Sequence, residues 1–98
     1  AGVIAPFNVP LGIAVWHIAP ALLTGNTVVY KPSEQTPRIA KELVAVFTEA
    51  GLPAGTLNLV LGGAAAGDAL VRDPAVRNLS FTGSTATGTE AGLSVGAA

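Results

Sequence analysis

Residues 25–37 read GNTVVYKPSEQTP, and they carry the strongest fold signal in the chain. Gly25-Asn26 is typical of the left-handed residues that end a helix. The β-branched and aromatic run from Thr27 to Tyr30 predicts a buried strand. Thr36-Pro37 predicts a helix start, with the threonine hydroxyl as N-cap and the proline in the first turn. The stretch therefore predicts a junction of helix, strand and helix.

The same alternation continues on both sides of this junction. Apolar runs predict strands at 2–5, 27–30, 56–61 and 78–81, and helices are predicted from Pro10, from Pro37, over 65–71 and after Ser84. The strands are continuously apolar, as in a parallel sheet that is covered on both faces. We therefore expect an α/β fold with a Rossmann-like parallel sheet, four strands and crossover helices, and one or both sheet edges uncovered.

The periodicity of apolar residues also predicts which helix faces are buried. The predicted core positions are Leu11, Val15, Ile18 and Leu22 in the first long helix, and Ile39, Leu43, Phe47 and Ala50 in the second. Trp16 is interpreted as a packing residue. His17 lies at mid-helix among apolar residues, which favours a structural over a catalytic role.

The composition excludes several classes of protein. Half of the 98 residues are hydrophobic and 11% are charged, which excludes intrinsic disorder. The net charge of −1 lacks the basic character of nucleic-acid binders. Cysteine is absent and there is one histidine, so these residues hold no disulfide, thiolate metal site, cysteine nucleophile or His-rich metal site. We expect no metal and no nucleic-acid partner.

No membrane or secretory segment is visible in the sequence. The most apolar stretch, residues 9–23, is shorter than the roughly 18 residues of a membrane span, and Pro10, His17 and Pro20 interrupt it. No basic region leads into an apolar core with a cleavage site. The chain starts with Ala and lacks a clear final helix stop. We therefore expect an internal piece of a larger cytoplasmic protein without a membrane partner.

The residues that follow each predicted strand are the candidates for ligand binding, because open α/β sheets bind ligands at the carboxyl ends of their strands. They are Pro6-Phe7-Asn8, Lys31-Pro32-Ser33-Glu34, Gly62-Gly63 and Thr82-Gly83-Ser84. Together they supply an amide, a cation, a carboxylate and two glycine turns at helix starts. All four turns should lie on one edge of the sheet.

Each candidate also has a structural interpretation. Asn8 suits a turn or a helix cap, and Lys31 suits a solvated charge at a strand end. Glu34 suits the positive end of the following helix. The glycines of 83–88 have the spacing of a P-loop, but the Lys-Ser/Thr that follows in that motif is missing.

An ordered series of motifs resembles the aldehyde dehydrogenase superfamily. The motifs are APFNVP at 5–10, IAPAL at 18–22, GNTVVYKPSEQTP at 25–37, EAGLPAG at 49–55 and FTGST at 81–85. The resemblance implies that residues 1–98 are part of the NAD(P)-binding domain. It also implies that the catalytic domain, with the cysteine nucleophile and the general base, lies downstream, so the chain alone is expected to be inactive.

The resemblance implies roles for individual residues. Asn8 matches the amide that stabilises the oxyanion when a thiolate attacks the aldehyde. Lys31 and Glu34 match contacts of the adenosine ribose, which favours NAD while leaving NADP possible. Gly83 and Ser84 match the turn at which the pyrophosphate meets a helix start. The remaining positions assigned to the cofactor site are Pro6, Phe7, Ser33, Gly63, Phe81 and Thr82, and Trp16 matches a position near the substrate.

The sequence also departs from the family pattern. Val9 stands where an aromatic residue is usual, His17 where a lysine is common, and Gly62-Gly63-Ala64 replaces a Gly-x-Gly turn. Two alternatives stay open: a family member that binds nucleotide without turnover, and another Rossmann-type oxidoreductase. The resemblance implies an aldehyde substrate, among which semialdehydes or aliphatic aldehydes are favoured, and a homodimer or homotetramer.

Overall fold

The computed structural model describes residues 1–7 and 10–83. In these residues strands and helices alternate as β1 (Gly2–Ile4), α1 (Pro10–Leu23), β2 (Val28–Lys31), α2 (Pro37–Glu49), β3 (Leu57–Leu59), α3 (Ala64–Arg72) and β4 (Leu79–Phe81). The predicted alternation is confirmed, although β1, β3 and β4 are shorter than expected and β2 is shifted by one residue. The helical segment predicted after Ser84 lies outside the described residues.

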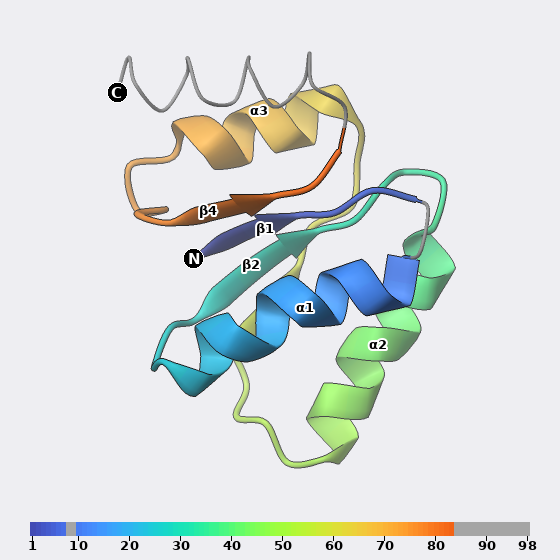
Figure 1. Cartoon of the computed structure of the whole chain (residues 1–98), viewed down its shortest axis with the longest axis vertical. Helices are drawn as coiled ribbons and strands as arrows, with labels where there is room; N and C mark the ends of the chain where they lie inside the picture. Colours follow the sequence, from blue (N-terminus) through green and yellow to red (C-terminus); the bar gives the residue numbers. More distant parts are fainter. Residues whose placement is uncertain (8–9, 84–98) are drawn as a thin grey trace.

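The strands form one parallel sheet in the order β3-β2-β1-β4. From β1 the chain passes outward to β2 and β3 through α1 and α2. It then crosses to the other side of β1 through α3 (Figure 1). The direction of strand succession therefore reverses between β1 and β4. The parallel sheet with crossover helices confirms the predicted fold class. Open α/β sheets bind ligands at such a switch point, which defines the edge at which a ligand is expected.

The two faces of the sheet carry different helices: α1 and α2 cover one face and α3 lies on the other (Figure 1). The main apolar core belongs to the α1/α2 face and consists of Val3, Ala5, Ala14, Ile18, Val28, Tyr30, Ala40, Leu43 and Leu57. Side chains alternate along a strand, so Ile4 and Lys31 point to the α3 face, where both lie near Gly67. Burial raises the pKa of the Tyr30 phenol in the core.

The helix ends agree with the sequence except at one hydroxyl. The left-handed conformation predicted at the end of α1 is confirmed at Gly25, with φ of +89°, and Gly51 after α2 has the same conformation, with φ of +100°. Pro37 begins α2 as predicted. However, the Thr36 hydroxyl does not cap α2: its oxygen is buried and has no hydrogen-bond partner among the described residues.

The predicted buried faces of α1 and α2 are confirmed at Ile18 and Leu43, which are buried, and at Val15, Leu22 and Phe47, which pack against the core, but three predicted positions are exposed. Leu11 and Ile39 are 52% and 42% exposed, and Ala50 is also exposed. Ala14 and Ala40 are buried in their place. Small side chains let the helices approach the sheet and each other closely, and this packing decides which face is covered. Trp16 is 76% exposed and does not pack as predicted within the described chain.

No helix within residues 1–7 and 10–83 has both the length and the apolar character that crossing a membrane requires.

Candidate functional site

The register of the sheet brings the ends of β1, β2 and β4 to one edge. Ile4, the last residue of β1, lies opposite Lys31 of β2 and Phe81 of β4. The Ala5 N–H donates to the Lys31 carbonyl oxygen at 3.3 Å, and the Thr82 N–H donates to the Ile4 carbonyl oxygen at 3.1 Å. The residues that follow these three strands therefore start from fixed neighbouring positions at the switch point.

Lys31 is buried on the α3 face, which corrects its interpretation as a solvated charge. Its residue is 7% exposed, and its side-chain stem packs against α3 beside Gly67. The Nζ atom donates to the carbonyl oxygen of Pro32 at 2.9 Å. Burial lowers the pKa of the ammonium group, whereas the negative charge of Glu34 acts in the opposite direction. A buried ammonium group needs hydrogen-bond acceptors. The Lys31 ammonium lies at the edge where a ligand is expected, so a ligand could supply further acceptors.

Glu34 is exposed and places its carboxylate at the start of α3. A Cβ atom built on Gly63, the residue before α3, would lie 2.7 Å from Oε2 of Glu34. Glycine at position 63 therefore leaves the space that the carboxylate occupies. The positive end of the helix dipole favours a negative charge there. The two charged candidates, Lys31 and Glu34, thus come from the turn after β2 and both approach α3.

The other candidates after β1 and β2 are placed less informatively. Pro6 is half-buried and Phe7 is 55% exposed, and both follow the central strand β1 at the switch point. The Ser33 hydroxyl oxygen accepts a hydrogen bond from the Gln35 N–H at 3.2 Å, which shapes the turn before α2. The Ser33 hydroxyl therefore takes part in a local structural contact.

The turn after β4 is closely packed. A Cβ atom built on Gly83 would lie 2.7 Å from Cζ of Phe81, so the phenyl ring folds over the glycine. The Thr82 hydroxyl lies 2.7 Å from Nε2 of His17 in α1, 65 residues earlier in the chain. The structure thus brings Phe81, Thr82 and Gly83 to the same edge as Lys31. Asn8 and Ser84, two further predicted site residues, lie outside the described residues.

The sequence did not predict that His17 contacts Thr82 at this edge. Its apolar neighbours in the helix favour a structural role, and its polar partner is distant in sequence. The departure from the family lysine at this position was the signal that could have directed attention to it.

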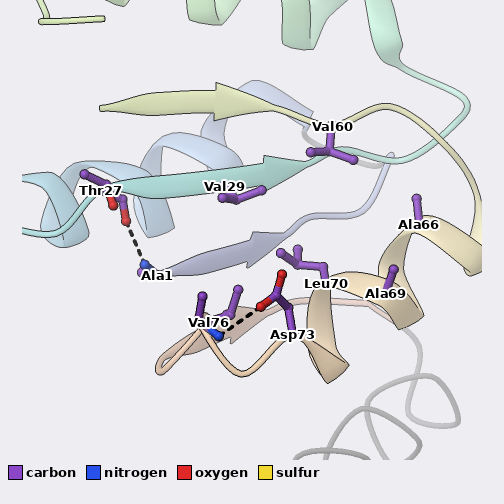
Figure 2. A pocket seen from close by; sticks show the side chains of 10 residues that line it. Ala1, Thr27, Val29, Val60, Ala66, Ala69, Leu70, Asp73 and Val76 are labelled. Atoms are coloured by element: carbon purple, nitrogen blue, oxygen red, sulfur yellow. Dashed lines mark hydrogen bonds between the residues drawn. The ribbon is translucent and has the colours of Figure 1, made fainter. Parts of the chain in front are cut away.

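A groove of 410 Å³ opens on the α3 face and contains none of the predicted site residues (Figure 2). Small apolar side chains of the sheet and α3, including Val29, Ala66 and Ala69, line it together with the Asp73 carboxylate. In Figure 2 the amino group of Ala1 and the carbonyl oxygen of Thr27, 2.7 Å apart, lie at its rim. The groove therefore offers little polar chemistry. In the part of the chain that the structure describes, no group of three or more His, Cys, Asp or Glu residues could hold a metal ion.

The fold and edge define a doubly wound α/β protein with its polar residues at the switch point. The chain belongs to the aldehyde dehydrogenase family, whose family model matches residues 1–97. It is 57% identical over 94 residues to a phenylacetaldehyde dehydrogenase of Pseudomonas fluorescens, covering 95% of this chain and 19% of the relative. It is 56% identical to a 2-aminomuconic semialdehyde dehydrogenase of Danio rerio, covering 89% and 18%.

A solved structure has the same fold. An NAD-dependent aldehyde dehydrogenase from Sinorhizobium meliloti matches with a TM-score of 0.94 and 40% identity, over 98% of this chain and 19% of that chain. The present chain thus spans about a fifth of the length of these relatives. The family and the fold predicted from the motifs are both confirmed.

Proposed function

We propose that this chain is the dinucleotide-binding part of an NAD(P)-dependent aldehyde dehydrogenase that oxidises an aldehyde to a carboxylic acid. The observation that supports it most is that the buried Lys31 ammonium, the Glu34 carboxylate and Gly63 lie close together at the carboxyl ends of the strands, in a chain of the aldehyde dehydrogenase family. In this proposal residues 1–98 belong to the NAD(P)-binding domain. The catalytic domain lies in another part of the whole protein.

The residues at the edge have the chemistry that a dinucleotide requires. A ribose presents vicinal hydroxyls, to which the Lys31 ammonium donates and from which the Glu34 carboxylate accepts hydrogen bonds. Because Gly63 lacks a Cβ, the exposed Glu34 carboxylate can lie at the start of α3. Gly83 would place backbone near the pyrophosphate, with Thr82, Phe81 and Pro6-Phe7 around it, and Ser84 would add a hydroxyl. Ser33 would shape the turn that carries Glu34.

Glu34 would favour NAD over NADP. A 2′-phosphate would bring negative charge close to a carboxylate that already occupies the start of α3. The carboxylate and the 2′-phosphate are both negative and would repel each other, so NADP would bind only after the flexible Glu34 side chain moved away. Glu34 is exposed and free to swing outward. The preference is therefore expected to be moderate, with NADP as a second cofactor.

Asn8 would act in the chemical step. A cysteine thiolate supplied by the catalytic domain attacks the aldehyde carbon and forms a thiohemiacetal, while the Asn8 amide and the backbone N–H of the cysteine stabilise the oxyanion. The nicotinamide supplies the hydride acceptor for the oxidation. A water molecule activated by a general base then hydrolyses the thioester to the carboxylic acid. No residue of this chain other than Asn8 is assigned to the reacting atoms.

The substrate is proposed from the relatives, whose names indicate an arylacetaldehyde and a semialdehyde. The whole protein is expected to be a cytoplasmic homodimer or homotetramer. The test is to express the full-length protein and to follow NAD reduction with phenylacetaldehyde and with semialdehydes of several lengths. We expect turnover with NAD and slower turnover with NADP.

One alternative remains distinct, namely a family member that binds nucleotide without turnover. It predicts that NADH binds to the full-length protein while no aldehyde of the panel is oxidised. Absence of both NADH binding and turnover would reject the proposal entirely. The other alternative, a different class of Rossmann-type oxidoreductase, is superseded by the family assignment.

A further inference from the structure

His17 and Thr82 connect two parts of the molecule that the chain separates by 65 residues. His17 belongs to α1, which follows β1, and Thr82 directly follows β4. The two strands are the neighbours between which the order of the sheet reverses. The hydrogen bond of 2.7 Å between Nε2 and the threonine hydroxyl therefore joins the two sides of the switch point on the α1 face.

At the end of β4, two hydrogen bonds hold Thr82, one through its backbone and one through its side chain. All three residues of β4 are half-buried, and Thr82 is half-buried as well. The Thr82 backbone is held by the Ile4 carbonyl oxygen at 3.1 Å, and its side chain by His17. A free threonine side chain samples more than one staggered rotamer, and the histidine selects one of them. The orientation of the Thr82 hydroxyl is thus set from α1.

We propose that His17 is a positioning residue for the cofactor contact at the end of β4. Its imidazole holds the Thr82 hydroxyl and thereby the Thr82-Gly83 turn in the conformation that receives the dinucleotide. A turn that is already ordered loses less conformational entropy when the ligand binds. This inference rests on the proposed function, because it assumes that the edge binds NAD.

The geometry favours positioning over a core role for this histidine. His17 is half-buried, whereas the core residues of α1 on the same face, Ala14 and Ile18, are fully buried. Its Nε2 atom contacts the side chain of Thr82, a residue of the predicted cofactor turn, across 65 residues of sequence. The histidine therefore acts on the site through one atom, Nε2.

Two conservative variants separate the role of that atom from the rest of the side chain. In the full-length protein, the terminal amide of His17→Gln reaches about as far as Nε2, whereas that of His17→Asn reaches only about as far as Nδ1. Thr82→Val removes the hydroxyl at nearly constant shape. Thr48→Val is the matched control, because the Thr48 hydroxyl donates to the Val44 carbonyl oxygen of its own helix at 3.0 Å. NADH dissociation constants, KM for NAD and for aldehyde, kcat and Tm are measured for each variant.

We expect His17→Asn and Thr82→Val each to weaken NADH binding and to raise KM for NAD by about three- to tenfold, the usual effect of one hydrogen bond. The aldehyde KM should stay within about twofold of the wild-type value. The double variant His17→Asn/Thr82→Val should be no weaker than the more impaired single variant, because both changes break the same bond. His17→Gln should bind NADH nearly as well as the wild type, and Thr48→Val should be unchanged.

Three results would overturn the inference. One is that His17→Asn lowers Tm while its folded fraction binds NADH normally, which is the behaviour of a merely structural histidine. Another is that the effects of the two single changes multiply in the double variant. A third is that His17→Gln binds as weakly as His17→Asn. Failure of the proposed function looks different, because the wild-type protein itself would then not bind NADH.

Discussion

The two faces of the sheet are built in different ways, although they meet at the same candidate edge. The α1/α2 face contains the continuous apolar core, and its polar contact at the edge is a hydrogen bond between His17 and Thr82. The α3 face has a buried ammonium, a carboxylate at a helix start and an open apolar groove. The difference indicates that the α1/α2 face stabilises the shape of the edge, while the α3 face contributes its charged groups. Substitutions on the two faces should therefore change different properties.

The largest effect is expected at Asn8, which we assign to neither face but to the chemical step. In the full-length protein, Asn8→Ala should lower kcat by about 10²–10³, the usual cost of removing one oxyanion donor. The donor matters little to the ground-state aldehyde, so NAD affinity should change little. Steady-state kinetics combined with NADH titration measure both.

The structural interpretation of Asn8 gives the opposite pattern. A helix-capping asparagine would lower the free energy of unfolding by about 0.5–2 kcal/mol when replaced by alanine, and turnover per folded molecule would survive. Thermal melts of the same variant distinguish the two. Early melting with normal kcat would remove Asn8 from the active site.

The second effect concerns the buried charge of the α3 face. Lys31→Met keeps the stem against Gly67 but removes the ammonium, and KM for NAD should rise by about tenfold or more, as expected for a charged hydrogen bond. Binding measurements with NADH test this loss. An unchanged KM for NAD would show that Lys31 is buried for structural reasons only.

The same variant gives a pH test whose sign follows from burial. The pKa of Lys31 is lowered in the folded chain, so the unfolded chain holds more protons on this amine. The free energy of unfolding therefore rises with pH through the window below the ordinary value of 10.5. The raised pKa of Tyr30 contributes with the opposite sign. The difference between wild type and Lys31→Met isolates Lys31, and this difference should shift in favour of the wild type as the pH rises.

The third effect concerns the carboxylate at the start of α3. Glu34→Ser should change the ratio of kcat/KM for NAD to that for NADP by about tenfold towards NADP, since a repulsion of like charges is removed. Gly63→Ala tests the same carboxylate by another route, because its Cβ would lie 2.7 Å from Oε2 and displace the Glu34 side chain. A wild-type protein that already prefers NADP strongly would contradict this assignment of Glu34.

The smallest effect compares two threonines with opposite surroundings. The Thr36 hydroxyl is buried without a partner among the described residues, so Thr36→Val should be neutral or raise the free energy of unfolding by up to about 1 kcal/mol. Thr82→Val breaks a hydrogen bond and should lower it by about 0.5–1.5 kcal/mol. Denaturant unfolding of both variants measures the contrast. A loss of stability in Thr36→Val as large as that of an N-cap would restore the capping role.

Much of the fold could be predicted because its signals are local. Gly25 and Gly51 end helices through their own backbone conformation, Pro37 begins one, and the apolar run at Val28–Tyr30 forms a strand. The candidate edge followed from the same reasoning, since residues after parallel strands share one edge. Within the predicted buried faces of α1 and α2, three of the eight positions are exposed. α1 is apolar on several sides, and in α2 the apolar residues Ile39 and Ala40 are adjacent, so periodicity alone did not select Ala14 and Ala40 over Leu11 and Ile39.

The sequence by itself determined the order of strands and helices, the parallel sheet, the family and the turns that carry Lys31, Glu34 and Thr82. These depend on backbone preferences and on residue patterns that are complete within short segments. Only the tertiary structure decided that Lys31 is buried against α3, that Glu34 lies beside Gly63, and that His17 contacts Thr82. Each of these contacts joins segments that are distant in sequence, and their geometry depends on how the helices pack on the sheet.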